Sequence, residues 1–88
     1  MNIKKKIIID VRSKVEYEEN HIEKAINIPL DILLNFENEI LKNKIVYLYC
    51  LSGNRSKTAL DFLTKKKIEC VDLGGIDEAK KIISNHNI

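Results

Sequence analysis

The sequence of 88 residues has no tryptophan, one proline, three glycines and two cysteines, and its aromatic content is 6%. Two cysteines are too few for the disulfide framework of a small secreted scaffold. Aromatic and basic residues do not alternate as they do on surfaces that stack single-stranded nucleic acid. The apolar run at residues 7–9 stops at Asp10, so it is too short for a secretory signal, and no run could span a bilayer. We therefore expect a cytoplasmic protein with reduced cysteines and no membrane partner.

Charged residues are numerous but nearly balanced, with 15 Lys and Arg against 13 Asp and Glu and a net charge of +2. Lysine clusters at residues 4–6, 65–67 and 80–81 are interleaved with acidic residues elsewhere, which is typical of solvated faces and not of a nucleic-acid surface. A chain of this length with 44% hydrophobic residues can bury one modest core. We expect residues 1–88 to form a single monomeric domain without a nucleic-acid partner.

Hydrophobic patterning alternates between strand-like and helix-like segments. Short apolar runs predict strands at residues 7–11, 25–28, 45–49 and 68–73, and helical spacing predicts helices at residues 14–20, 30–41, 56–66 and 77–84. Strands that are separated by helices pair in parallel. The predicted fold is therefore α/β, a small parallel β-sheet of about four strands with helices on both faces. Ligand sites in such sheets lie beyond the C-terminal ends of the strands.

A cysteine stands where the third predicted strand ends. Cys50 is followed by the segment LSGNRS, and helical spacing resumes at Ala59. A loop that turns this quickly from strand to helix points its backbone N–H groups inward, and these groups, the helix N-terminus and Arg55 all favour a thiolate. The alternative is that Cys50 is an ordinary buried small hydrophobe.

Two rare residue types in this loop favour the reactive interpretation. Gly53 is one of three glycines, and Arg55 is one of two arginines, the other being Arg12, in a chain that otherwise uses lysine. Glycine lets backbone amides approach a ligand closely. The planar fork of arginine suits bidentate contacts with oxyanions or the bracing of a loop. The sequence thus predicts that Cys50 is a nucleophile in an anion-binding loop.

Further segments follow in a characteristic order: Asp10-Val11-Arg12, Glu16-Tyr17, His21-Ile22, Ala25, Asn27-Ile28-Pro29, the loop from Cys50 to Arg55, and Leu73-Gly74-Gly75. Together they resemble the rhodanese-like (sulfurtransferase) domain family over most of the chain, and the loop is the specific part. The resemblance implies that Cys50 accepts sulfane sulfur from thiosulfate or a persulfide donor and carries it as a persulfide. It implies a small acceptor or a persulfide-carrying protein as partner, and no cofactor and no metal.

The resemblance also implies a set of site residues. Cys50 and Arg55 would be catalytic, and the substrate-binding residues would be Leu51, Ser52, Gly53, Asn54, Ser56 and Arg12. Arg12 has a second interpretation, in which it pairs with a carboxylate and braces the loop. His21 is expected to have a capping or hydrogen-bonding role, or alternatively to act as a base for the thiol. Cys70 is expected to lie in the core or, alternatively, to act as a resolving thiol.

Two other functions remain open. Cysteine-dependent phosphatases and arsenate reductases resemble this family but use one residue more between cysteine and arginine, whereas Cys50 to Arg55 spans six residues; Asp61 lies in the helical pattern and is no obvious acid for a leaving group. A non-catalytic module that docks a protein is the other alternative, and the presence of both Cys50 and Arg55 argues against it.

Two departures from the family pattern stand out. Leu51 follows the cysteine where thiosulfate-using members often carry a basic residue, so thiosulfate is expected to be a poor donor. Glu23-Lys24 stands where many relatives have Pro-Gly.

Overall fold

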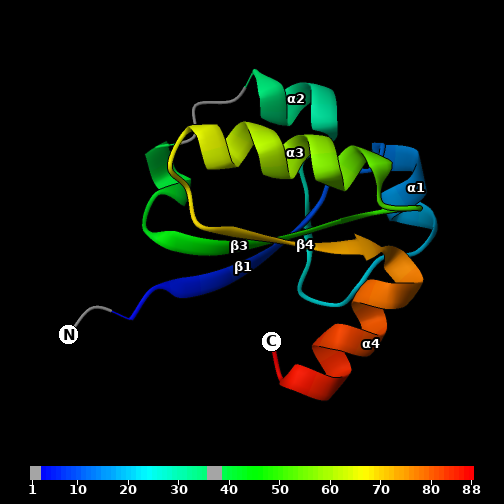
Figure 1. Cartoon of the computed structure of the whole chain (residues 1–88). Coiled ribbons are helices and arrows are strands. Elements are labelled where there is room, and N and C mark those ends of the chain that lie inside the picture. Colours follow the sequence, from blue (N-terminus) through cyan, green and yellow to red (C-terminus); the bar gives the residue numbers. More distant parts are fainter. Residues whose placement is uncertain (1–2, 36–38) are drawn as a thin grey trace.

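The computed structural model describes residues 3–35 and 39–88. The elements follow in the order β1 (Lys5–Asp10), α1 (Lys14–Glu19), β2 (Ile26–Asn27), α2 (Leu30–Leu34), the 3-10 turn η1 (Glu39–Leu41), β3 (Lys44–Cys50), α3 (Asn54–Lys65), β4 (Cys70–Gly75) and α4 (Ile76–His86). All three strand pairs are parallel, in the order β2-β1-β3-β4. Helices α2 and α3 cover one face of the sheet and α4 the other (Figure 1), which confirms the predicted α/β fold.

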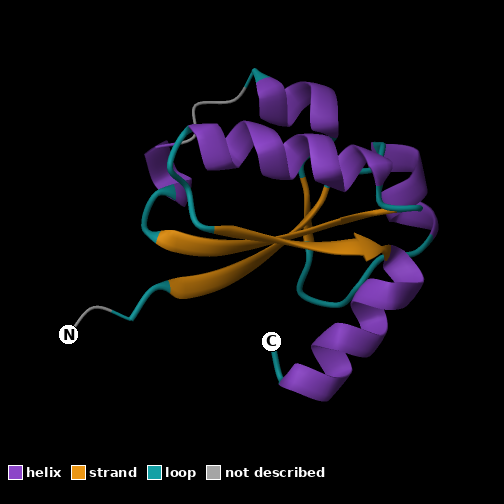
Figure 2. Cartoon of the chain, viewed as in Figure 1, coloured by secondary structure: helices purple, strands orange, loops and turns teal. Residues whose placement is uncertain are grey.

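Alternating residues of the two central strands divide the core into two layers. Ile9 and Leu48 face α3 and belong to one buried cluster, and Ile8 and Tyr49 belong to the other, on the side of α4. This is the period of two that a strand imposes on its side chains. The same alternation turns Cys50 toward α3. The end of β3 leads through a short loop into the N-terminus of that helix (Figure 2).

The helix predicted over residues 30–41 is wrong in its length. α2 ends at Leu34, where the Asn35 N–H closes the last turn on the Ile32 carbonyl at 3.0 Å. The Asn35 side chain donates to the Asp31 carbonyl at 2.8 Å, a local bond by which asparagine competes with helix propagation. Residues 36–38 of the predicted helix lie outside the described residues, and η1 then brings Leu41 into the core at 1% exposure.

The last strand begins two residues later than the pattern predicts because α3 ends in a Schellman motif. Lys67 adopts a left-handed conformation with φ of +63°. Its N–H donates to the Thr64 carbonyl at 2.9 Å, and the Ile68 N–H donates to the Leu63 carbonyl at 3.1 Å. These two bonds satisfy carbonyls at the helix end, so β4 starts only at Cys70. Among the described residues, no helix is long and apolar enough to cross a membrane.

Candidate active site

The thiol of Cys50 lies in the turn that joins β3 to α3. The backbone N–H groups of Gly53 and Ser56 donate to its Sγ at 3.0 and 3.4 Å. Gly53 adopts φ of +102°, a conformation that glycine reaches without steric cost, and this lets the loop fold its amides back over the sulfur. The inward-pointing amides therefore lie where the sequence predicts them, and Cys50 itself is only 1% exposed.

The end of β4 packs against the back of this loop. A β-carbon added to Gly75 would lie 2.5 Å from the Leu51 carbonyl oxygen, and one added to Gly53 would lie 3.8 Å from the Gly74 Cα. An irregularity between Leu48 and Cys50 brings Gly75 into register with Cys50. Only a residue without a side chain fits at Gly75, and this lets β4 approach the loop closely.

Hydrogen bonds favour the ionised form of Cys50. Burial of the thiol opposes ionisation, but the Ser56 hydroxyl and the N–H groups of Ser56, Gly53 and Ser52 together lower the pKa of Cys50 below its ordinary value. In the protonated state Sγ lies 3.5 Å from Ser56 Oγ, which in turn donates to the Gly53 carbonyl at 3.1 Å. The site is therefore built to hold a sulfur anion.

Arg55 occupies the second position of α3, and its guanidinium binds Glu16 of α1. Nη1 and Nη2 donate to the two carboxylate oxygens at 2.7 and 3.0 Å. Glu16 also forms a capping box with Ser13, whose backbone N–H and hydroxyl both donate to its Oε1 at 3.0 Å. Arg55, more than any other group, lowers the pKa of Glu16 to about 2. This ion pair connects the start of α3, next to the Cys50 loop, to α1, the helix between β1 and β2.

Glu16 is a site residue that the sequence alone does not reveal. The spacing of Ser13 and Glu16 is a recognisable capping box, but Arg55 lies 39 positions away. Only the fold brings the carboxylate to the guanidinium.

The Arg12 side chain is buried and forms an ion pair with Asp10, so it is not accessible to a ligand in the loop. Its side chain is 4% exposed, and Nε and Nη2 donate to the carboxylate of Asp10 at 3.0 and 2.7 Å. Nη2 also donates to the Asn20 carbonyl at 2.6 Å, and the guanidinium lies 5.7 Å from the ring centre of Tyr49. This geometry supports the bracing interpretation of Arg12 and not contact with substrate.

Other predicted substrate-binding residues line the outside of the loop. Leu51 is 58% exposed, and Ser52 and Asn54 are also exposed. Ser56 is fully buried beneath them. The Leu51 side chain is thus open to solvent, while Ser56 contacts the thiol.

Cys70 and His21 contact residues outside the Cys50 loop. Cys70 pairs in register with Val46, four residues before Cys50 on β3, so about 13 Å of strand lies between the positions of the two cysteines. A disulfide or a resolving role for Cys70 is incompatible with that separation. His21 Nδ1 lies 2.8 Å from the Tyr17 carbonyl, and its ring stacks on the Tyr17 ring at 3.8 Å, as expected for a hydrogen-bonding role. Within residues 3–35 and 39–88, no group of three or more His, Cys, Asp or Glu could hold a metal ion.

Known proteins are similar to this chain in sequence and in fold. The model of the rhodanese-like domain matches residues 1–82. The chain is 39% identical over 87 residues to a probable molybdopterin-synthase adenylyltransferase of Porphyra purpurea, covering 96% of the chain but 23% of that protein. It is 35% identical over 74 residues to the adenylyltransferase and sulfurtransferase uba4 of Ogataea parapolymorpha, covering 81% of the chain and 19% of that protein. The chain therefore spans about a fifth of the length of these two relatives.

This chain covers a much larger share of a related protein whose structure has been solved. The crystal structure of a rhodanese-related protein from Thermoplasma volcanium superposes with a TM-score of 0.75 at 33% identity, covering 86% of this chain and 77% of that one. The two proteins thus share the fold and are similar in sequence. This chain belongs to the rhodanese-like domain family.

Proposed function

We propose that this domain is a sulfurtransferase that carries sulfane sulfur as a persulfide on Cys50 and passes it to a thiophilic acceptor. One observation carries the proposal: the Sγ of Cys50 accepts hydrogen bonds from the backbone N–H groups of Gly53 and Ser56 at the N-terminus of α3. Donors arranged in this way stabilise an anion, and a persulfide is an anionic sulfur. Membership of the rhodanese-like family and likeness to a protein named as a sulfurtransferase support it.

The reaction has two steps. The Cys50 thiolate attacks the sulfane sulfur of thiosulfate, a new S–S bond forms, and sulfite leaves with the electron pair of the bond that breaks. The acceptor then attacks the outer sulfur of the persulfide, and the bond to Sγ breaks and returns the thiolate. Because hydrogen bonds lower the pKa of Cys50, the second step gains a better leaving group. A persulfide donor enters the same scheme and leaves as a thiolate.

Arg55 contributes charge and rigidity in this scheme. Its guanidinium is fixed by two bonds to Glu16, and its positive charge favours a sulfur anion in the neighbouring loop. Ser52, Gly53, Asn54 and Ser56 supply loop amides, and Leu51 borders the entrance. The acceptor is a small thiophilic molecule or a protein that carries the sulfur away as a persulfide.

The test is thiocyanate formation from cyanide with thiosulfate or glutathione persulfide as donor. We expect the Cys50→Ser variant to lose all turnover and the matched Cys70→Ser variant to keep it. Loss in the Cys70 variant alone, or no turnover with either donor, would overturn the proposal. Hydrolysis of p-nitrophenyl phosphate by the same preparation, with no thiocyanate formed, would assign the site to phosphatase chemistry instead.

A further inference from the structure

The end of β4 contains one residue more than the stretch of β3 with which it pairs. Leu48 pairs in register with Asp72, but Cys50 pairs with Gly75, so three residue steps on β4 match two on β3. An extra residue in one strand of a pair is a β-bulge, which bends the strand and occurs often beside active sites. This bulge places Gly75 next to the residue that carries the thiol.

The Asp72 side chain forms a hydrogen bond within the bulge. Its Oδ1 accepts the Gly74 N–H at 2.8 Å, and Gly74 adopts φ of +83°, a conformation that glycine reaches without steric cost. An aspartate that accepts from the backbone two residues later replaces a bond that the strand no longer makes. The carboxylate therefore holds the chain on the path that leads into Gly75.

The peptide group between Leu51 and Ser52 lies directly against Gly75. A β-carbon added to Gly75 would lie 2.5 Å from the Leu51 carbonyl oxygen, 3.3 Å from its carbon and 3.4 Å from the Ser52 Cα. This peptide is trans, and a trans peptide is a planar unit that turns its carbonyl and its N–H together. Contact at the carbonyl therefore also sets the direction of the Ser52 N–H, one of the donors that lower the pKa of Cys50.

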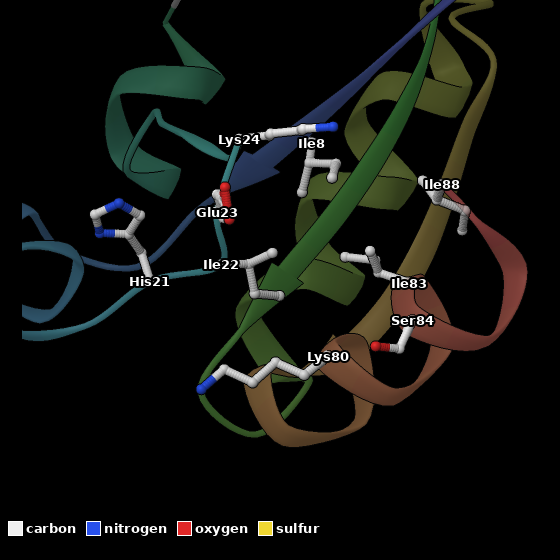
Figure 3. Close-up of a pocket in the computed structure, with 9 residues that line it drawn as sticks. All are labelled: Ile8, His21, Ile22, Glu23, Lys24, Lys80, Ile83, Ser84 and Ile88. Atoms are coloured by element: carbon white, nitrogen blue, oxygen red, sulfur yellow. The ribbon is translucent and has the colours of Figure 1, made fainter.

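Helix α4 holds Gly75 from the other side, because Gly75 is its N-cap and Ile76 its first residue. Ile76 is 6% exposed and belongs to the buried cluster that contains Ile8 and Ile22. Farther along the helix, Ile83 lines one pocket together with Ile8 and Ile22 (Figure 3). Side chains packed in a core keep their positions, so α4 fixes the chain after Gly75 and the bulge fixes the chain before it.

We propose that Asp72 is a positioning residue for the Cys50 loop. Its carboxylate holds the bulge that presses Gly75 against the Leu51–Ser52 peptide. Without the carboxylate oxygen the bulge loses its hydrogen bond and relaxes, and the N–H of that peptide turns away from the thiolate. The inference rests on the proposed function in one respect, since the anion that the loop stabilises is the nucleophile of sulfur transfer.

The test compares Asp72→Ala with Asp72→Asn in the Cys70→Ser background, where Cys50 is the one remaining thiol. The pH dependence of alkylation by iodoacetamide reports the pKa of Cys50. We expect the alanine substitution to raise the alkylation midpoint by at least about half a pH unit, because a donor to the thiolate is lost. Asparagine keeps an oxygen that accepts the Gly74 N–H, so its midpoint should stay near that of the parent. Arg55, whose charge also acts on Cys50, is the same in every variant.

Two further variants sharpen the comparison. Glu69→Ala is the matched control, because it removes a carboxylate next to β4 that bonds to Lys4, and it should leave the midpoint in place. Gly75→Ala tests the next contact independently of Asp72, since its β-carbon must displace the Leu51 carbonyl, and it should raise the midpoint.

Alkylation needs no sulfur donor, so this test and that of sulfur transfer can fail separately. A lower melting temperature of Asp72→Ala with an unchanged midpoint would show that Asp72 serves stability alone, and would overturn the proposal. Equal midpoints in the alanine and asparagine variants, or an unchanged midpoint in Gly75→Ala, would overturn it as well. The expected midpoints in a protein that forms no thiocyanate would support the positioning role of Asp72 and contradict only the proposed function.

Discussion

Arg55 and Glu16 meet fork to fork, with Nη1 and Nη2 of the guanidinium 2.7 and 3.0 Å from the two carboxylate oxygens. Arg55 belongs to the helix that begins at the Cys50 loop, and Glu16 to α1. Two parallel bonds fix an orientation as well as a distance. The pair therefore locks the start of α3, and with it the amides that surround the thiol, against a separate part of the fold.

We predict that Arg55→Lys lowers sulfur-transfer turnover roughly tenfold, because lysine keeps the charge but cannot bind both oxygens of Glu16. Arg55→Ala should lower it further. Steady-state thiocyanate formation measures both variants. Near wild-type turnover in the lysine variant, with loss in the alanine variant, would show that Arg55 acts through charge alone.

The same pair should contribute to stability above an acidic threshold. The pKa of Glu16 is lowered to about 2, so the unfolded chain binds a proton at higher pH than the folded one. The stabilisation is then fully present above the ordinary glutamate pKa and is lost as pH falls from about 4.5 toward 2. Urea unfolding of wild type and Glu16→Gln between these pH values should show a difference that shrinks with acidity. A difference independent of pH would contradict this account.

Ser56→Ala should raise the pKa of Cys50, because among the groups that lower this pKa the Ser56 hydroxyl has the largest effect. The rate of alkylation by iodoacetamide rises with pH as the thiolate forms, and its midpoint reports that pKa. Thr58→Ala is the control, since its exposed hydroxyl bonds to the Asn54 carbonyl in the same helix. A midpoint that moves equally in both variants would mean that the Ser56 hydroxyl has no specific effect.

Sequence patterns predict what depends on neighbours in the chain. Short apolar runs alternating with helical spacing predict the parallel sheet, and the spacing of Cys50, Gly53 and Arg55 predicts the loop. Contacts between residues that are far apart in the sequence cannot be predicted from these local patterns. Glu16 and Arg55, for example, are 39 positions apart. The helical spacing after Leu30 also does not predict where the helix ends, because it does not reveal that the Asn35 side chain donates to the Asp31 carbonyl there.

Leu51→Arg should increase second-order turnover with thiosulfate. Leu51 directly follows Cys50 and is 58% exposed, so a positive charge at this position would attract a dianion toward the loop. The gain should shrink as salt screens the charge, and turnover with an uncharged persulfide donor should change much less. Rates with both donors at low and high ionic strength decide this. An equal, salt-insensitive change for both would show that Leu51 acts by packing.

The central claim is that Cys50 holds the transferred sulfur, and the intact mass of the protein tests it most directly. After incubation with thiosulfate or glutathione persulfide, we expect a gain of one sulfur atom that peptide mapping assigns to Cys50 and that cyanide removes. Cys70→Ser should gain the same adduct, and Cys50→Ser none. An adduct on Cys70, or no adduct with either donor, would contradict the account.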